Sequence, residues 1–261
     1  MQKVYEELTN AFRKNRGEIS PTLYNKIVSN SFLEDEDTSF LLLQSSGYPI
    51  DRDNSKYILK TYKTPYRDQK FCVIDIETNG SKPEVAQVIE VGALIVQNGK
   101  IIDKFDSLVY SDFIPEYVSK ITGISRESLI NAPKERAVLN QLRIFMQDTI
   151  FVAHNANFDY GFLNYSFKKL GLGDIGNQKF CSIDLAKRTI ESEKYGLAFL
   201  NESLELGVDT HHRAYSDALT TVKLLDILFK NLPKYVKSSD ELIRFSISSR
   251  KERTNKKKHK N

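Results

Sequence analysis

The segment from Phe71 to Ile76, Phe-Cys-Val-Ile-Asp-Ile, constrains the fold of this 261-residue chain more than any other segment. It is an almost unbroken apolar run, which is typical of a strand buried on both faces of a sheet. A strand of this kind needs helices packed on both sides of its sheet. The segment therefore predicts a layered α/β domain rather than a sheet with one face in water.

Further strands and helices are expected after this run. Residues 87–96 and 100–109 alternate apolar and polar side chains across Asn98-Gly99, which predicts a β-hairpin. Two more strands are expected over 149–153 and 180–183. Apolar residues at helical spacing predict helices over 157–170, about 184–194, 199–206 and 214–231. This order predicts an α/β fold with a mixed β-sheet flanked by helices.

The chain divides into four predicted parts. Residues 1–67 are expected to form a small, mainly helical N-terminal accessory region, with helices over 4–13, 20–31 and 38–44 and a short strand over 55–62. The Thr64-Pro65 step favours a boundary, because the residue before a proline avoids the helical conformation. The remaining predicted parts are a main domain over 68–232, a C-terminal extension with one short helix over 233–249, and a disordered basic tail over 250–261.

The composition fits a folded intracellular protein. Apolar residues make up 40% of the chain and aromatic residues 11%, which is enough for a sizeable core. Two cysteines, Cys72 and Cys181, are too few for a disulfide framework, which favours a reducing compartment. The N-terminus lacks the apolar core of a signal peptide, and no apolar run reaches membrane-spanning length. We therefore expect a soluble cytoplasmic protein with no membrane partner.

The net charge of +4 is unevenly distributed. Residues 250–261 carry seven Lys or Arg and one Glu, a net charge of +6, so the rest of the chain carries −2. Seven cations in one tail could bind the phosphates of nucleic acid, with an affinity that falls steeply as salt rises. A solubilising tail without a partner is the alternative, and the sequence does not separate the two.

Asp75 and Glu77 are two residues apart on the predicted buried strand, so their carboxylates lie on one face. Most isolated Asp-x-Glu pairs are solvent-facing residues of an edge strand. Here the preceding run is too apolar for an edge strand, and Thr78-Asn79-Gly80 predicts a turn that would open a site. The pair is therefore a candidate metal site.

Two further segments each contribute an acid and a histidine. The segment from His154 to Asp159, His-Asn-Ala-Asn-Phe-Asp, leaves an apolar strand and places Asp159 in the first turn of a helix. An acidic residue there can simply stabilise the helix dipole. His212 and Asp217 are five residues apart, with Asp217 inside the last long helix. Taken alone, that pair is equally well explained as a loop histidine and a capping aspartate.

In this order, the segments beginning at Asp75, His154 and His212 resemble the three exonuclease motifs of the DEDDh family, which includes the epsilon proofreading subunit of bacterial DNA polymerase III. The resemblance covers about residues 69–232, and Gln87–Ala93 is similar to the family's second strand. It implies a ribonuclease H-like fold. The site residues that it implies are Asp75, Glu77, Asp159 and Asp217 as metal ligands, His212 rather than the adjacent His211 as general base, and Thr78 and Asn155 as substrate contacts.

The implied chemistry is a two-metal hydrolysis. Carboxylate ligands suit two divalent cations, Mg²⁺ or Mn²⁺, and the chain has no thiolate set for zinc. The resemblance implies 3′→5′ hydrolysis of DNA from single-stranded 3′ ends to nucleoside 5′-monophosphates, as in replicative proofreading, with the DNA polymerase III catalytic subunit as partner. An RNA-trimming exonuclease of the same family is the alternative, because the motifs do not distinguish the sugars. A non-catalytic polymerase adaptor or nucleic-acid-binding module is a third reading, which an intact five-residue set disfavours.

Overall fold

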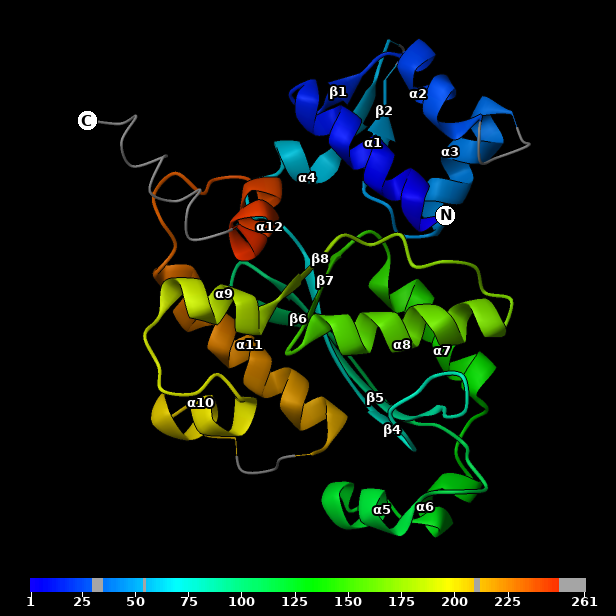
Figure 1. Cartoon of the computed structure of the whole chain (residues 1–261), viewed down its shortest axis with the longest axis vertical. Helices are drawn as coiled ribbons and strands as arrows, with labels where there is room; N and C mark the ends of the chain where they lie inside the picture. The colour runs from blue at the N-terminus through cyan, green and yellow to red at the C-terminus, as the bar shows by residue number, and fades with distance from the viewer. Residues whose placement is uncertain (30–34, 54, 209–211, 249–261) are drawn as a thin grey trace.

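A computed structural model of the chain describes residues 1–29, 35–53, 55–208 and 212–248. Its centre is a five-stranded sheet in the order β6-β5-β4-β7-β8 (Figure 1). The strands are β4 (Phe71–Thr78), β5 (Val88–Gln97), β6 (Lys100–Leu108), β7 (Ile150–Ala153) and β8 (Lys179–Cys181). β4 pairs antiparallel with β5 and parallel with β7, so the predicted mixed sheet is confirmed and the strand that carries Asp75 lies at its centre.

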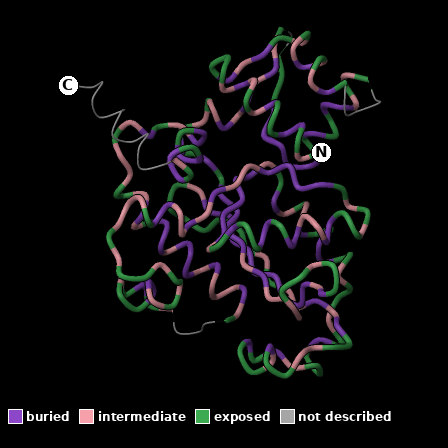
Figure 2. Tube along the Cα trace, viewed as in Figure 1, coloured by how far each residue is buried: buried purple, intermediate pink, exposed green. Residues whose placement is uncertain are grey.

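Helices cover both faces of this sheet, because β4 buries alternate side chains on opposite sides. Cys72 and Ile74 belong to one core cluster, whereas Phe71 and Val73 belong to the other. The first face packs against α7 (Glu135–Met146) and α8 (Ala156–Lys169). The second packs against α9 (Ser182–Thr189), α10 (Leu197–Ser203), α11 (Ala214–Lys230) and α12 (Ser239–Ile247). Figure 2 shows the buried segments concentrated in the strands between these two layers.

The hairpin predicted at Asn98-Gly99 joins β5 and β6, and both turn residues have positive φ, 53° and 69°. A two-residue turn of this kind matches the twist of the paired strands. Three helices between β6 and β7 were not predicted: α5 (Glu116–Thr122), α6 (Arg126–Ile130) and α7. The apolar spacing of Val138, Leu139, Leu142 and Met146 in α7 was a usable signal, whereas α5 and α6 are too short to show a period.

The N-terminal region forms its own small core, and the expectation that it is mainly helical is incomplete. Its elements are α1 (Gln2–Lys14), β1 (Glu18–Ile19), α2 (Pro21–Val28), α3 (Glu36–Ser45), β2 (Ile50–Arg52), β3 (Tyr57–Leu59) and α4 (Lys60–Lys63). The strands pair in the order β1-β3-β2. The strand predicted over 55–62 is therefore shorter, and its last residues lie in α4. The helices and strands of this unit share one hydrophobic core that is separate from the two cores of the main domain.

Helix α3 of this unit carries acidic residues, Glu36 and Asp37, in its first turn. Its sequence, from Glu36 to Ser45, contains no Lys or Arg, and its N-cap is Asp35. Helices that enter a DNA groove depend on cations that contact phosphates. The charge of α3 therefore opposes DNA binding in that mode.

Helix α12 joins the N-terminal unit to the main domain (Figure 1). Ser238 and Glu241 form a capping box at its start, and Leu242 and Phe245 belong to the core beneath α11. Residues expected as a C-terminal extension thus contribute to the main core. On its other side, the guanidinium of Arg13 donates to Oδ1 of the fully buried Asp240 at 2.7 and 2.8 Å.

No helix among the described residues is both long and apolar enough to span a membrane. Both cysteines are free. The predicted basic tail over 250–261 and His211 lie outside the described residues.

Candidate active site

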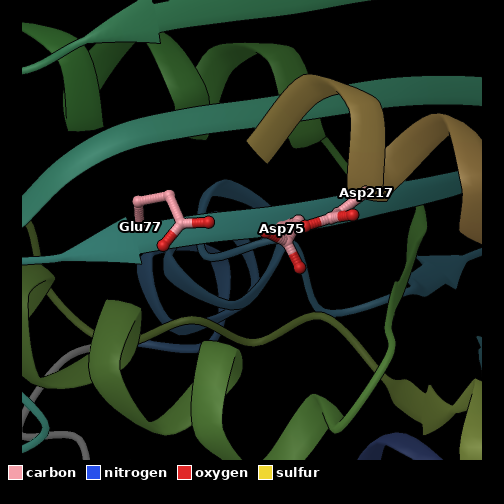
Figure 3. Close-up of side chains that lie close together, drawn as sticks. All are labelled: Asp75, Glu77 and Asp217. Carbon is pink, nitrogen blue, oxygen red and sulfur yellow. The ribbon is translucent and has the colours of Figure 1, made fainter. Parts of the chain in front are cut away.

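Strand β4 directs Asp75 and Glu77 toward the face covered by α11, because they continue the alternation begun by Phe71 and Val73. Asp217 lies in the first turn of α11. One carboxylate oxygen from each of these three residues lies within 4.8 Å of the others. Figure 3 shows the carboxylates of Asp75 and Asp217 close together, with Glu77 farther along β4. The structure therefore brings three of the four predicted metal ligands into one group.

A glycine on β5 permits this approach of helix to strand. Gly92 is the Cα partner of Asp75. A Cβ at Gly92 would lie 2.2 Å from the backbone nitrogen of Tyr215 and 2.3 Å from the carbonyl carbon of Ala214. The start of α11 therefore contacts the backbone of β5 directly, and only a residue without a side chain fits between them.

Asp159 reaches the site from α8, the helix that follows the neighbouring parallel strand β7. It lies in the first turn of α8, with only 3% of its surface exposed. The pairing of β4 with β7 ends at Val73 and Val152, and beyond it the backbone N–H of Ile76 donates to the carboxylate of Asp159. Asp159 is not one of the three acids that share the 4.8 Å group. Its charge nevertheless acts on Asp75.

Electrostatics in the site disfavour the ionised acids. Burial, followed by the charges of Asp159, Asp217 and Glu77, raises the pKa of Asp75 well above its usual range. Burial, followed mainly by the charges of Asp217 and Glu90, raises the pKa of Glu77 to about 7. Burial also raises the pKa of Asp159 to about 7. A cluster of this kind needs a cation to hold its acids ionised at neutral pH.

His212 precedes α11 and lies at the edge of the site. Its imidazole is exposed, and its backbone has a φ of 58°. The backbone N–H of His212 donates to Oδ2 of Asp217 at 3.1 Å. The structure thus ties the predicted base to one predicted ligand through the main chain, while the imidazole lies outside the carboxylate group.

The other predicted contacts, Thr78 and Asn155, lie at the end of β4 and at the start of α8. Thr78 is half-buried, and its hydroxyl donates to the carbonyl of Gly80 at 2.8 Å. Asn155 is exposed, with a φ of 83°, and it is the N-cap of α8.

Both ring nitrogens of His154 form hydrogen bonds within the fold. Its Nδ1 lies 2.8 Å from the hydroxyl of Ser182 and its Nε2 lies 2.9 Å from the carbonyl of Tyr195. Burial lowers the pKa of His154 to about 4, so its ring is neutral at pH 7. It therefore connects the end of β7 to the first residue of α9 and to the segment that follows α9, and it carries no charge to the site.

The exonuclease family model matches residues 72–225, which include all four acids and both histidine-containing segments. The chain belongs to the exonuclease family. The resemblance to DEDDh exonucleases is thereby confirmed, and the protein is a nuclease. The match begins within β4 and ends within α11, so it covers the sheet and the helices that carry the site.

Curated relatives of this exonuclease are named DNA polymerase III PolC-type. The protein of that name from Thermotoga petrophila is 38% identical over 165 residues, which are 63% of this chain and 12% of the relative. The one from Staphylococcus aureus is 34% identical over 183 residues, which are 69% of this chain and 12% of the relative. The chain therefore spans a small part of the length of these relatives.

Solved structures show the same fold. Exonuclease X in complex with 5′ overhanging duplex DNA has a TM-score of 0.52 and 24% identity, and the match covers 67% of this chain and 99% of that one. E. coli exonuclease I in complex with a dT13 oligonucleotide has a TM-score of 0.56 and 16% identity, and covers 62% of this chain and 41% of that one. The predicted ribonuclease H-like fold is confirmed.

Proposed function

We propose that this protein is a divalent-metal-dependent exonuclease that hydrolyses DNA from the 3′ end to nucleoside 5′-monophosphates. The observation that carries the proposal is the group formed by Asp75, Glu77 and Asp217, whose oxygens lie within 4.8 Å of one another on an exonuclease fold. A binding-only module has no need for clustered acids, which repel phosphate.

The residues of the site fit a divalent cation. All are hard oxygen donors, which suit Mg²⁺ or Mn²⁺. We assign Asp75, Glu77 and Asp217 as ligands, and Asp159 as the fourth acid beside them. Two cations bound there would stabilise the charge that develops on the attacking and leaving oxygens of a phosphodiester. The raised pKa values of Asp75 and Glu77 support this assignment, because burial and the neighbouring carboxylates together disfavour the ionised forms.

His212 is the proposed general base. An exposed imidazole at the edge of the carboxylate group can accept a proton from the attacking water and pass it to solvent. The hydrogen bond from His212 N–H to Asp217 holds the backbone of His212 beside this acid whether or not the ring is protonated, because it uses the main chain. Thr78 and Asn155 are proposed substrate contacts, since Thr78 ends β4 after Glu77 and Asn155 caps the helix that carries Asp159.

Proofreading at a replicative polymerase is the proposed role. The relatives named DNA polymerase III PolC-type support a connection with a polymerase, and the complexes of exonucleases X and I with DNA support single-stranded DNA ends as substrate. We infer that the polymerase III catalytic subunit is a partner and that the reaction takes place in the cytoplasm, where two free cysteines are stable.

Digestion of a 5′-labelled single-stranded DNA and the matching RNA tests the proposal. Reactions contain Mg²⁺, Mn²⁺ or chelator, with Asp75→Ala as the control variant. The expected result is a metal-dependent ladder that shortens from the 3′ end of the DNA. If RNA is digested faster than DNA, RNA trimming replaces proofreading as the proposed role. If neither strand is cleaved, the enzymatic proposal is overturned.

A further inference from the structure

We propose that Glu90 and Arg213 form a clamp that positions the start of α11, and with it Asp217, against the carboxylates of β4. This inference rests on the proposed function, because it concerns how the metal-binding acids are held together. Glu90 and Arg213 are positioning residues, since they act through α11 and not on the substrate.

The contacts of the clamp use both oxygens of one buried carboxylate. Glu90 is 1% exposed. Arg213 donates from Nη2 and Nε to Oε1 of Glu90, at 2.6 and 3.0 Å, and from Nε to Oε2 at 3.3 Å. The backbone N–H of Ala214, the first residue of α11, donates to Oε2 at 2.9 Å. Glu90 therefore caps the helix and pairs with the residue before it, and it has no oxygen left for a metal.

The register of the sheet places this clamp directly across from the predicted ligands. Glu90 is the Cα partner of Glu77, and Gly92 is the Cα partner of Asp75. Gly92 removes the side chain that would separate β5 from Ala214 and Tyr215. The two residues opposite the acids of β4 thus contact α11, the helix that carries Asp217. Glu90 does so through hydrogen bonds, and Gly92 does so by leaving space for the helix backbone.

The clamp favours one position of α11, because any other position leaves the buried carboxylate of Glu90 unpaired. A shift or rotation of α11 would break these hydrogen bonds and leave the carboxylate of Glu90 without a partner inside the protein, which is strongly unfavourable. Two donors of one rigid guanidinium and the N–H of Ala214 contact the same carboxylate, so the clamp fixes orientation as well as distance. Asp217 lies four residues after Arg213, about one helical turn, so the orientation and distance fixed by the clamp also set its position.

Three variants test the clamp: Glu90→Gln, Arg213→Gln and the double variant. Each is titrated with Mn²⁺ by calorimetry without nucleic acid, and then assayed for kcat and KM on single-stranded DNA. Each single variant is expected to weaken Mn²⁺ binding by roughly 10–100-fold and to lower kcat while KM changes less than about threefold. The double variant is expected to be no worse than the poorer single variant, because both remove the same clamp. Arg213→Lys, which keeps one charge-assisted bond, is expected to recover part of the Mn²⁺ affinity.

Asp240→Asn is the matched control. It breaks a second ion pair of a buried carboxylate, with Arg13, which joins α12 to the N-terminal unit and lies outside the carboxylate group of the site. Its Mn²⁺ affinity and kcat are expected to stay within about twofold of the wild type below its melting temperature. If the wild type binds Mn²⁺ and hydrolyses DNA, and if Glu90→Gln has the same Mn²⁺ affinity and kcat as Asp240→Asn, the clamp is overturned. The proposed function would stand in that case. Absence of Mn²⁺ binding in the wild type would overturn the proposed function and the clamp together.

Discussion

The backbone N–H of His212 and the carboxylate of Asp217 are joined by a 3.1 Å hydrogen bond across the start of α11. The proposed base and one proposed ligand are therefore linked through the main chain, although their side chains have different proposed roles. The bond uses the main chain of His212, so replacing its imidazole leaves the bond in place. This separation makes the two roles testable one at a time.

His212→Ala is expected to retain Mn²⁺ binding and to lower kcat by roughly 10²–10⁴-fold, the usual contribution of a general base. The check is Mn²⁺ calorimetry beside a nuclease assay on the same preparation. His211→Ala provides the matched control, since it removes the adjacent histidine. Equal loss of activity in both variants would contradict the choice of His212.

Asp75→Ala and Asp217→Ala are expected to abolish turnover without unfolding the domain. Removing one acid relieves repulsion within the group when no metal is present, because the charges of Asp159, Asp217 and Glu77 all act on Asp75. Circular dichroism and thermal melting in chelator, together with the nuclease assay, provide the measurement. A fully active Asp75→Ala protein would remove Asp75 from the site.

The stability of the metal-free protein is expected to fall as pH rises from about 5 to 8. Glu77 and Asp159 have folded pKa values raised to about 7, so protonation favours the folded state. Their contribution is fully present below the ordinary carboxyl pKa of about 4 and is lost as pH rises through about 7.

Melting temperatures in chelator between pH 5 and 8 measure this effect. Asp75→Asn is expected to be more stable than the wild type by the order of 1–2 kcal/mol at pH 8 and to match it at pH 4. Mn²⁺ should raise the melting temperature of the wild type most at pH 8. The geometry requires the acids to repel one another. Parallel curves of melting temperature against pH for the wild type and Asp75→Asn would contradict this repulsion.

Gly92→Ala is expected to lower the free energy of unfolding by about 1–3 kcal/mol and to reduce activity, because the new methyl group meets the backbone of α11. Gly161→Ala, in α8, is the matched control: a Cβ there meets no atom within 4 Å. It should leave activity unchanged and stabilise the helix by up to about 1 kcal/mol. Chemical denaturation and the nuclease assay give both quantities. Equal stability and activity of the two variants would contradict the close contact at Gly92.

Deletion of residues 250–261 is expected to leave kcat unchanged and to reduce the salt dependence of DNA binding. Seven Lys or Arg are removed, and each phosphate contact on a single strand contributes about −0.7 to the slope of log affinity against log salt. Titrations between 50 and 200 mM salt, roughly the range in which such contacts are lost, give the slope. An unchanged slope would leave the tail without a role in binding.

The sequence alone determined the layers of the fold and the candidate acids. The apolar run before Asp75 requires a strand covered on both faces, and Asn98-Gly99 requires a hairpin, because both are local consequences of side-chain size and backbone freedom. The chemical types and order of Asp75, Glu77, Asp159, His212 and Asp217 were likewise readable from the motifs. The helices α5 and α6 were not, since one or two turns leave no period to detect.

Only the tertiary structure decided how the acids meet. Glu90 and Gly92 read in the sequence as ordinary members of a strand, and their roles appear only because α11 packs on β5 at those positions. The small sheet of the N-terminal unit was hidden for a related reason: strands of two or three residues are stabilised by partners distant in the chain rather than by their own composition. Local chemistry thus selected the residues, whereas long-range packing set the distances between them.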